Sequence, residues 1–170
     1  MPVFYKRLFF SIFYFLFFTL LFACTRLPNI QGKGEVFLQG IWQQDSVAKS
    51  STLLNYTQHN LKITCDSFYL AFTTHAKVNY YDDACFNKGI WKEFAKGTYL
   101  VKGDTLILNG TFTKANYKQK VSGCYRNGRY LANFKIKTVN KTSLLLENLN
   151  DHKQYPLSLT EKTICTQKEL

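Results

Sequence analysis

The chain has 170 residues and a formal net charge of +11, a length that suits one domain with a single core and excludes a large multidomain enzyme. None of its five cysteines forms a Cys-x-x-Cys pair, which excludes the common zinc and dithiol redox motifs. The excess of basic over acidic residues favours anionic partners such as lipid headgroups, polysaccharide or carboxylate ligands. A need for solubility is the other explanation of this excess.

The first 23 residues predict a cleaved secretory signal. Lys6 and Arg7 precede an apolar run from Leu8 to Ala23, and this order of a positive head, an apolar middle and a small final residue is typical of export signals. The run has 16 residues, fewer than the roughly 20 of a spanning helix. Leu21-Phe22-Ala23-Cys24 resembles the lipobox of bacterial lipoproteins, so we expect a signal-peptide helix over 1–23 and lipidation at Cys24. An uncleaved anchor helix is the alternative.

Residues 24–35 predict a lipidated, flexible tether, because Pro28, Gly32 and Gly34 interrupt a segment with little apolar content. Acyl chains on Cys24 make a membrane the first expected partner. No acidic residue directly follows Cys24, which by resemblance to other lipoproteins implies delivery to the outer membrane, on either face. The remaining domain, residues 36–170, is expected in the cell envelope.

Short apolar segments separated by turn residues predict an all-β domain. The expected strands are Phe37–Gln43, Asn60–Cys65, Phe68–His75, Gly89–Val101, Asp104–Lys114, Arg129–Thr138, Ser143–Leu149 and Gln154–Thr160. Asn-Gly, Gly-Asp and Asn-Asp turns favour antiparallel neighbours. A short helix is expected near Ser46–Tyr56. Eight or nine strands in a meander most simply close into a small antiparallel barrel, since closure removes exposed edges.

Alternation along two of these segments identifies the expected inner face. Leu106, Leu108 and Phe112 share one side of their strand, opposite Thr105, Ile107, Asn109 and Thr111. Tyr130, Phe134 and Ile136 share one side of a later strand, opposite Lys135 and Lys137. We expect the apolar sides to form the core.

Two motifs carry a family resemblance. Gly40-Ile41-Trp42 and GTYLVKGDTLILNGTF (97–112) resemble the small lipocalin-like barrels of Bacteroidetes lipoproteins, in which a Gly-x-Trp opens the first strand. The chain is closer still to a group of these lipoproteins that shares QGKGEVFLQGIWQQDS (31–46), YTQH (56–59), CDSFY (65–69), TTHAKVNYYDDACF (73–86) and GTFTKANYKQKVSGCYR (110–126). The resemblance covers essentially all of the chain after the signal and implies a lipocalin-like barrel. Members of the group are often labelled fumarate hydratase.

Hydration of fumarate needs a base for water and cationic groups that hold two carboxylates. Arg126, Arg129, His59 and His75 are the side chains of the right types, but nothing in their spacing selects them. The Gly-Ser-Ser-x-Met-Pro loop of one fumarase class is absent, since Met1 is the single methionine. We therefore expect a module that binds a small apolar or anionic ligand or an envelope protein, with the enzyme and a structural envelope-assembly lipoprotein as alternatives. No cofactor and no nucleic acid partner is expected.

Cys65, Cys85, Cys124 and Cys165 remain for disulfides once Cys24 is lipidated, and an even number in an exported chain favours two bridges. If Gly89–Val101 is one strand, strand parity puts Cys85 near Cys124 and Cys65 near Cys165. If a turn at Lys96-Gly97 divides that strand, parity pairs Cys65 with Cys124 and Cys85 with Cys165. We favour the first pairing.

Three places hold candidate ligand-binding residues. Trp42 is expected to pack across one end of the barrel, with a ligand-pocket wall as the alternative. The long loop 74–85 offers polar and aromatic contacts, and either a lid pinned by Cys85 or a metal site from His75, Asp82 and Asp83 is conceivable there. The basic segment 114–129 favours a solvated hairpin or an anionic lipid or glycan. The candidates are Trp42, His75, Tyr80, Tyr81, Asp82, Asp83, Arg126 and Arg129.

Overall fold

A computed structural model of the chain describes residues 30–169. The expected signal peptide and the lipidation site Cys24 lie outside the described residues. Gln31–Glu169 form one compact unit, and all that follows concerns this unit. Residues 30–169 include no helix with the length and hydropathy that a membrane crossing requires.

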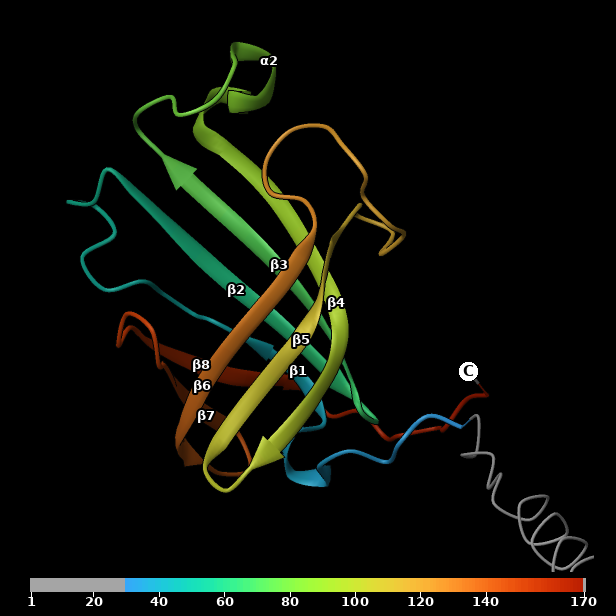
Figure 1. Cartoon of the computed structure of the whole chain (residues 1–170). Coiled ribbons are helices and arrows are strands. Elements are labelled where there is room, and N and C mark those ends of the chain that lie inside the picture. The colour runs from blue at the N-terminus through green and yellow to red at the C-terminus, as the bar shows by residue number, and fades with distance from the viewer. Residues whose placement is uncertain (1–29, 170) are drawn as a thin grey trace, which may run out of the picture. The chain divides into compact units, whose positions relative to one another are not determined.

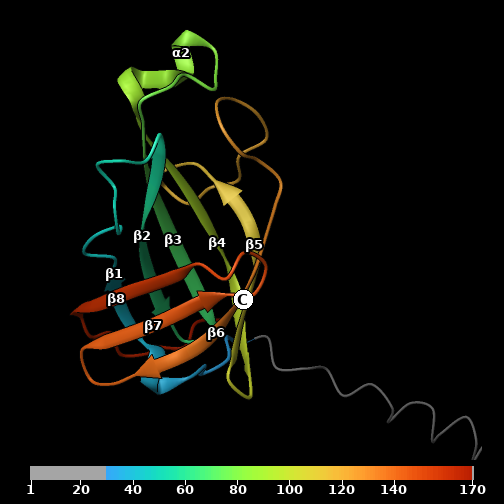
Figure 2. The ribbon, with the colours of Figure 1, turned by 90° about the vertical axis from the view of Figure 1, so that its left-hand side faces the viewer.

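Eight antiparallel strands form a closed barrel in which every strand pairs with its neighbours in sequence (Figures 1 and 2). The strands are β1 (Gly40–Gln43), β2 (Asn55–Thr64), β3 (Ser67–Ala76), β4 (Ile90–Lys102), β5 (Thr105–Thr113), β6 (Arg129–Val139), β7 (Ser143–Asn148) and β8 (Gln154–Glu161). Pairing of β1 with β8, with Trp42 opposite Leu159, closes the circle. The expectation of a small all-β, lipocalin-like barrel is confirmed, with eight strands.

The alternation read from the sequence matches the burial of the side chains. On β5, Leu106 and Leu108 are fully buried and Phe112 is nearly so, while Asn109 on the other face is exposed. On β6, Tyr130, Ala132 and Phe134 are buried and Lys135 is exposed. These inward residues join those of the other strands in one hydrophobic core.

β4 runs unbroken through Lys96 and Gly97, so the alternative in which a turn at these residues divides the strand is wrong. Gly97 lies directly opposite Gly110 of β5. A Cβ atom on Gly97 would lie 2.1 Å from the carbonyl oxygen of Asn109, so only glycine permits the close approach of these two strands. With β4 continuous, Cys65 and Cys165 lie at one end of the barrel and Cys85 and Cys124 at the other.

The structure contains both bridges of the first pairing, Cys65–Cys165 and Cys85–Cys124. The expectation of two disulfides is confirmed. Disulfides of this kind are typical of proteins outside the reducing cytoplasm.

The end of the barrel that holds Cys65 is closed by packed side chains. A short 3-10 helix η1 (Val36–Leu38) precedes β1, and the side chains of Leu38 and Trp42 are completely buried. The indole Nε1 of Trp42 donates to the carbonyl oxygen of Leu38 at 2.6 Å. Trp42 therefore packs across the closed end. The predicted strand Phe37–Gln43 was wrong in its first part, because η1 occupies Val36–Leu38.

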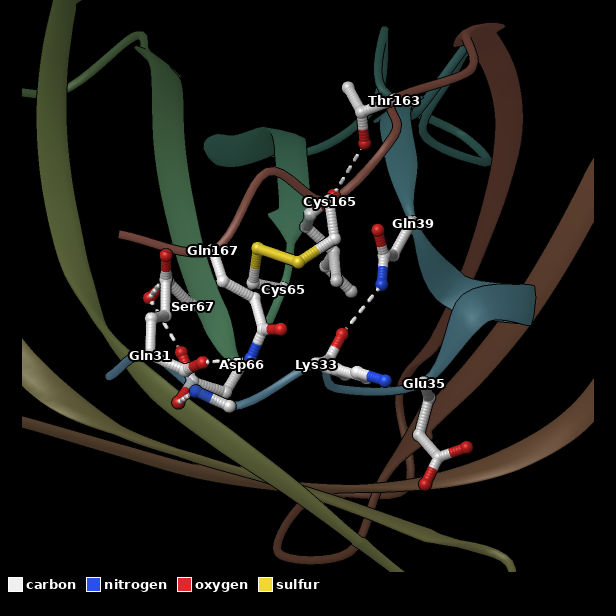
Figure 3. Close-up of a disulfide and its surroundings, with 12 residues drawn as sticks. Gln31, Lys33, Glu35, Gln39, Cys65, Asp66, Ser67, Thr163, Cys165 and Gln167 are labelled. Carbon is white, nitrogen blue, oxygen red and sulfur yellow. Dashed lines mark hydrogen bonds between the residues drawn. A yellow bond between two sulfur atoms is a disulfide. The ribbon is translucent and has the colours of Figure 1, made fainter. Parts of the chain in front are cut away.

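Residues 31–35, which were expected to belong to the flexible tether, pack instead against the closed end around Cys65–Cys165 (Figure 3). The amide of Gln31 donates to Ser67 Oγ at 2.7 Å, and the backbone N–H of Gly32 donates to Asp66 Oδ2 at 2.8 Å. The backbone N–H of Gln31 also donates to the carbonyl oxygen of Lys168 at 2.8 Å, so both ends of the described chain meet here.

The predicted helix near Ser46–Tyr56 was wrong. Residues 48–52 form turns, and β2 begins at Asn55. The hydroxyl of Thr52 donates to the carbonyl oxygen of Lys49 at 2.9 Å, and Lys49 itself has a positive φ of 56°. Such local hydrogen bonds from Ser and Thr compete with a helix and explain the turn. Within residues 30–169, the one α-helix is the short α2 (Asp83–Phe86), followed by the 3-10 helix η2 (Asn87–Gly89).

Candidate functional site

Four loops surround the open end of the barrel, opposite η1: β1–β2 (44–54), β3–β4 (77–89), β5–β6 (114–128) and β7–β8 (149–153). The wall is uneven, because β4 has 13 residues and β7 has six (Figure 2). The disulfide Cys85–Cys124 ties the β3–β4 loop to the β5–β6 loop. The two loops on the tall side are thus held together.

A cavity of about 630 Å³ opens at this end, beside the short wall. Its lining combines aromatic rings, amides and two cations, with no carboxylate. The lining residues are Gln44, Ser46, Val47, Ala48, Leu53, Asn55, Tyr56, Thr57, His59, Phe72, Arg126, Lys153, Gln154, Tyr155 and Pro156. A smaller apolar void of about 20 Å³ lies deeper, lined mainly by leucines and sharing His59 and Tyr155 with the cavity. The site therefore passes from polar at the mouth to apolar inside.

Arg126 reaches into the mouth from the β5–β6 loop and binds a buried carboxylate on β4. Its Nε donates to Glu93 Oε1 at 2.9 Å and its Nη2 to Glu93 Oε2 at 3.0 Å. Its backbone N–H also donates to Glu93 Oε1, at 3.1 Å. The Glu93 side chain is 5% exposed, whereas that of Arg126 is 48% exposed. Glu93 thus fixes one edge of the guanidinium and leaves the rest open to the cavity.

The guanidinium of Arg126 also covers two rings of the core. Its central carbon lies 4.9 Å from the ring centre of Phe72 and 4.8 Å from that of Phe112. These cation–π contacts hold the planar group against the two aromatic rings. Tyr130 packs against both rings below it, and burial raises the pKa of the Tyr130 hydroxyl, so this group stays protonated. Arg126 therefore forms the border between the aromatic core and the cavity.

His59 of β2 lies between the cavity and the core. Its ring makes edge contacts with Phe72 at 5.3 Å and Tyr155 at 4.6 Å. Burial, together with the charges of Arg126 and Lys153, lowers the pKa of His59 to about 4. The imidazole is therefore neutral near pH 7.

An aromatic cluster lies beside the Cys85–Cys124 bridge. The rings of Trp91 and Tyr125 stack at 5.4 Å, and Tyr81 makes edge contacts with both. The hydroxyl of Tyr125 donates to the carbonyl oxygen of Cys85. The cluster fastens the two tied loops to β4 and so fixes the direction from which Arg126 enters the mouth.

The structure brings one of the sequence-predicted ligand candidates, Arg126, into the cavity. Trp42 lies in the core of the closed end. His75 stacks on Tyr56 at the rim and borders a separate shallow groove. The remaining candidates lie in exposed loops or at an exposed strand end: Tyr80, Tyr81, Asp82, Asp83 and Arg129. No group of three or more His, Cys, Asp or Glu side chains within residues 30–169 has the arrangement of a metal site.

The sequence interpretation missed Gln44, Glu93, Lys153 and Tyr155. One signal was present for Glu93: alternation with Trp91 and Ala95 places it on the apolar face of its strand. A buried carboxylate needs a cationic partner, and Arg126 supplies it. Comparisons of the chain with protein families, with curated proteins and with solved structures found no match.

Proposed function

We propose that this chain is a lipid-anchored cell-envelope lipoprotein whose barrel binds a small ligand at its open end. The observation that carries the proposal is the cavity of about 630 Å³, into which a loop tied by a disulfide presents Arg126. Pockets for small molecules are commonly about 300–1,000 Å³, with apolar walls and a few polar groups that fix orientation. The rings of His59 and Tyr155 and the cations Arg126 and Lys153 supply both kinds of contact.

A bound ligand can be detected without knowing its identity. We would purify the full chain from membranes, release it from detergent and record native and denaturing mass spectra. The expected result is a species of fixed stoichiometry that is lost on denaturation. Ala48 lies in the lining and is exposed, so Ala48→Trp should fill the cavity and remove the bound species. Ala115→Trp, the same change on an exposed loop outside the lining, is the matched control.

If the wild-type chain and both variants show only the mass of the protein itself, ligand binding is contradicted, and binding of a protein partner to the outer surface of the barrel is favoured.

The lipid anchor is tested in the same spectra. Lipidation at Cys24 predicts a chain that begins at Cys24 and carries acyl groups, and Cys24→Ala should abolish this mass shift. An unprocessed N terminus starting at Met1 would overturn the lipoprotein part of the proposal alone.

A further inference from the structure

We propose that the ligand of the open end is an amphipathic hydroxy acid, with its carboxylate on Arg126 and Lys153, its hydroxyl on His59 and its chain toward the leucine-lined void. This inference rests on the proposed function, since it names the ligand class of the same cavity.

Arg126 keeps hydrogen-bond donors that Glu93 does not use. A guanidinium carries five N–H donors, and Glu93 takes one from Nε and one from Nη2. Three N–H groups remain, including a neighbouring pair on the two terminal nitrogens. No side chain within the described residues accepts from them. A parallel pair of N–H donors matches the two oxygens of a carboxylate, and bidentate pairing of this kind is strong.

The charges around the cavity leave a net positive charge of about one. Arg126 and Glu93 offset each other, which leaves Lys153 as the cation among the lining residues. Lys153 contacts Asp151 at 3.5 Å, but both side chains are largely exposed, and such a pair contributes little. The site therefore suits a single negative charge more than a dianion.

The contacts of Gln44 fix the hydrogen-bonding role of His59. The amide nitrogen of Gln44 donates to the carbonyl oxygen of Ser46 at 3.3 Å, so its Oε1 faces His59. That oxygen accepts from the backbone N–H of His59 at 3.3 Å and lies 3.0 Å from ring Nδ1. Nδ1 must then carry the proton, because Oε1 cannot donate. Since the ring is neutral near pH 7, Nε2 is an acceptor.

No side chain within residues 30–169 donates to His59 Nε2. His59 is half-buried and lines the cavity, so a ligand hydroxyl that enters there can donate to Nε2. A plain carboxylate does not, since it is itself only an acceptor near pH 7. The combination of free Arg126 donors and a His59 acceptor therefore selects a ligand with both an anion and a hydroxyl. The cavity of about 630 Å³ exceeds the needs of a very small acid and has room for an apolar chain, whose end would lie against the leucines around the void beneath, Leu61, Leu70 and Leu157 among others.

Four eight-carbon ligands separate these contributions: 2-hydroxyoctanoate, 3-hydroxyoctanoate, octanoate and octane-1,3-diol. Each is titrated calorimetrically into the full chain held in lipid nanodiscs, with empty nanodiscs as the blank. We expect the better hydroxy acid to bind about tenfold more tightly than either octanoate, which lacks the hydroxyl, or the diol, which lacks the carboxylate. A factor of about ten is the effect of losing one buried polar contact. Equal affinities for all four overturn this inference and leave the proposed function standing. Binding of none overturns this inference alone, because the native mass spectra test the proposed function independently of the ligand class.

Substitution of His59 tests the assignment of the hydroxyl. His59→Phe keeps a ring against Phe72 and Tyr155 but removes the acceptor, so hydroxy acid and octanoate should then bind equally. His75→Phe, the same change at the rim and outside the cavity lining, should behave as wild type. A preference for the hydroxyl that persists in His59→Phe overturns the assignment. The ligand series on the wild-type chain decides the ligand class even if His59→Phe fails to fold.

Discussion

The hydroxyl of Tyr99, on β4, donates a hydrogen bond of 2.8 Å to the carbonyl oxygen of Cys65 in the β2–β3 turn. The same hydroxyl accepts from the backbone N–H of Glu35 at 2.7 Å. Burial raises the pKa of Tyr99, so the hydroxyl remains a donor near pH 7. One side chain therefore joins the N-terminal segment, a turn and the barrel wall beside the Cys65–Cys165 bridge.

Removal of this hydroxyl should destabilise the closed end. Tyr99→Phe leaves the carbonyl of Cys65 and the N–H of Glu35 without their partner, and we expect the free energy of unfolding to fall by about 2–3 kcal/mol. Urea denaturation followed by circular dichroism measures the change. Tyr80→Phe is the control, because Tyr80 is 53% exposed and its loss of a hydroxyl should leave the midpoint unchanged. Equal midpoints for the two variants would show that the bridging contacts do not stabilise the fold.

The free energy of unfolding should decrease as the pH falls from about 6.5 to about 4, because protonation of His59 favours the unfolded chain over this range. The unfolded chain binds a proton at this group near pH 6.5, and the folded chain only near pH 4. The contribution is therefore complete above about pH 6.5 and is lost progressively toward pH 4, by about 3 kcal/mol in total. Carboxylates also titrate over this range, so the quantity to measure is the difference in pH dependence between wild type and His59→Phe. Parallel curves, or an NMR midpoint for His59 near 6.5, would contradict this prediction.

The Arg126–Glu93 pair should respond asymmetrically to mutation. Arg126→Met leaves a buried carboxylate without its cation, and we expect a loss of about 2–4 kcal/mol. Glu93→Gln should cost less, because the half-exposed Arg126 can turn toward water. The double variant should resemble Glu93→Gln, which gives a large coupling energy in a double-mutant cycle. Additive losses would indicate that the two side chains act independently.

The two disulfides should differ in what they control. The loops that they close span 100 and 39 residues, and chain entropy gives losses of about 4.7 and about 3.9 kcal/mol for removal of Cys65–Cys165 and Cys85–Cys124 respectively. Cys85→Ala with Cys124→Ala should also weaken ligand binding, since that bridge positions the loop of Arg126. Cys65→Ala with Cys165→Ala should lower thermal stability and leave affinity unchanged. Weaker binding on removal of Cys65–Cys165, with unchanged affinity on removal of Cys85–Cys124, would contradict this prediction.

Gly97 should tolerate no side chain. In Gly97→Ala, the new Cβ meets the backbone of β5, and separation of the strands should cost about 1–3 kcal/mol or more. Thr98→Ala, a substitution at the exposed neighbouring position, should change stability by less than about 0.5 kcal/mol. Thermal unfolding of the two variants gives the comparison, and an unaffected Gly97→Ala would show that β4 and β5 can move apart freely.

The barrel was predictable from the sequence because its strands alternate strictly, as Leu106, Leu108 and Phe112 illustrate. The turns at 48–52 were read as a helix, since spacing alone does not reveal that Thr52 bonds to its own loop. The site was harder to predict. Lys92-Glu93 resembles an ordinary surface pair, and Arg126 resembles any residue of a basic loop. Their pairing depends on a loop folded back across the mouth, which is a property of the tertiary structure and not of either segment.

The meeting of both chain ends at the closed end has a mechanical consequence. A force that acts on Gln31 enters the barrel next to the hydrogen bond of Gln31 with Lys168 and close to the disulfide Cys65–Cys165 (Figure 3). Force applied there would be borne first by these contacts and by Tyr99, all of them far along the strands from His59 and Arg126. A force on this end of the described chain should therefore leave the shape of the open end, near His59 and Arg126, unchanged.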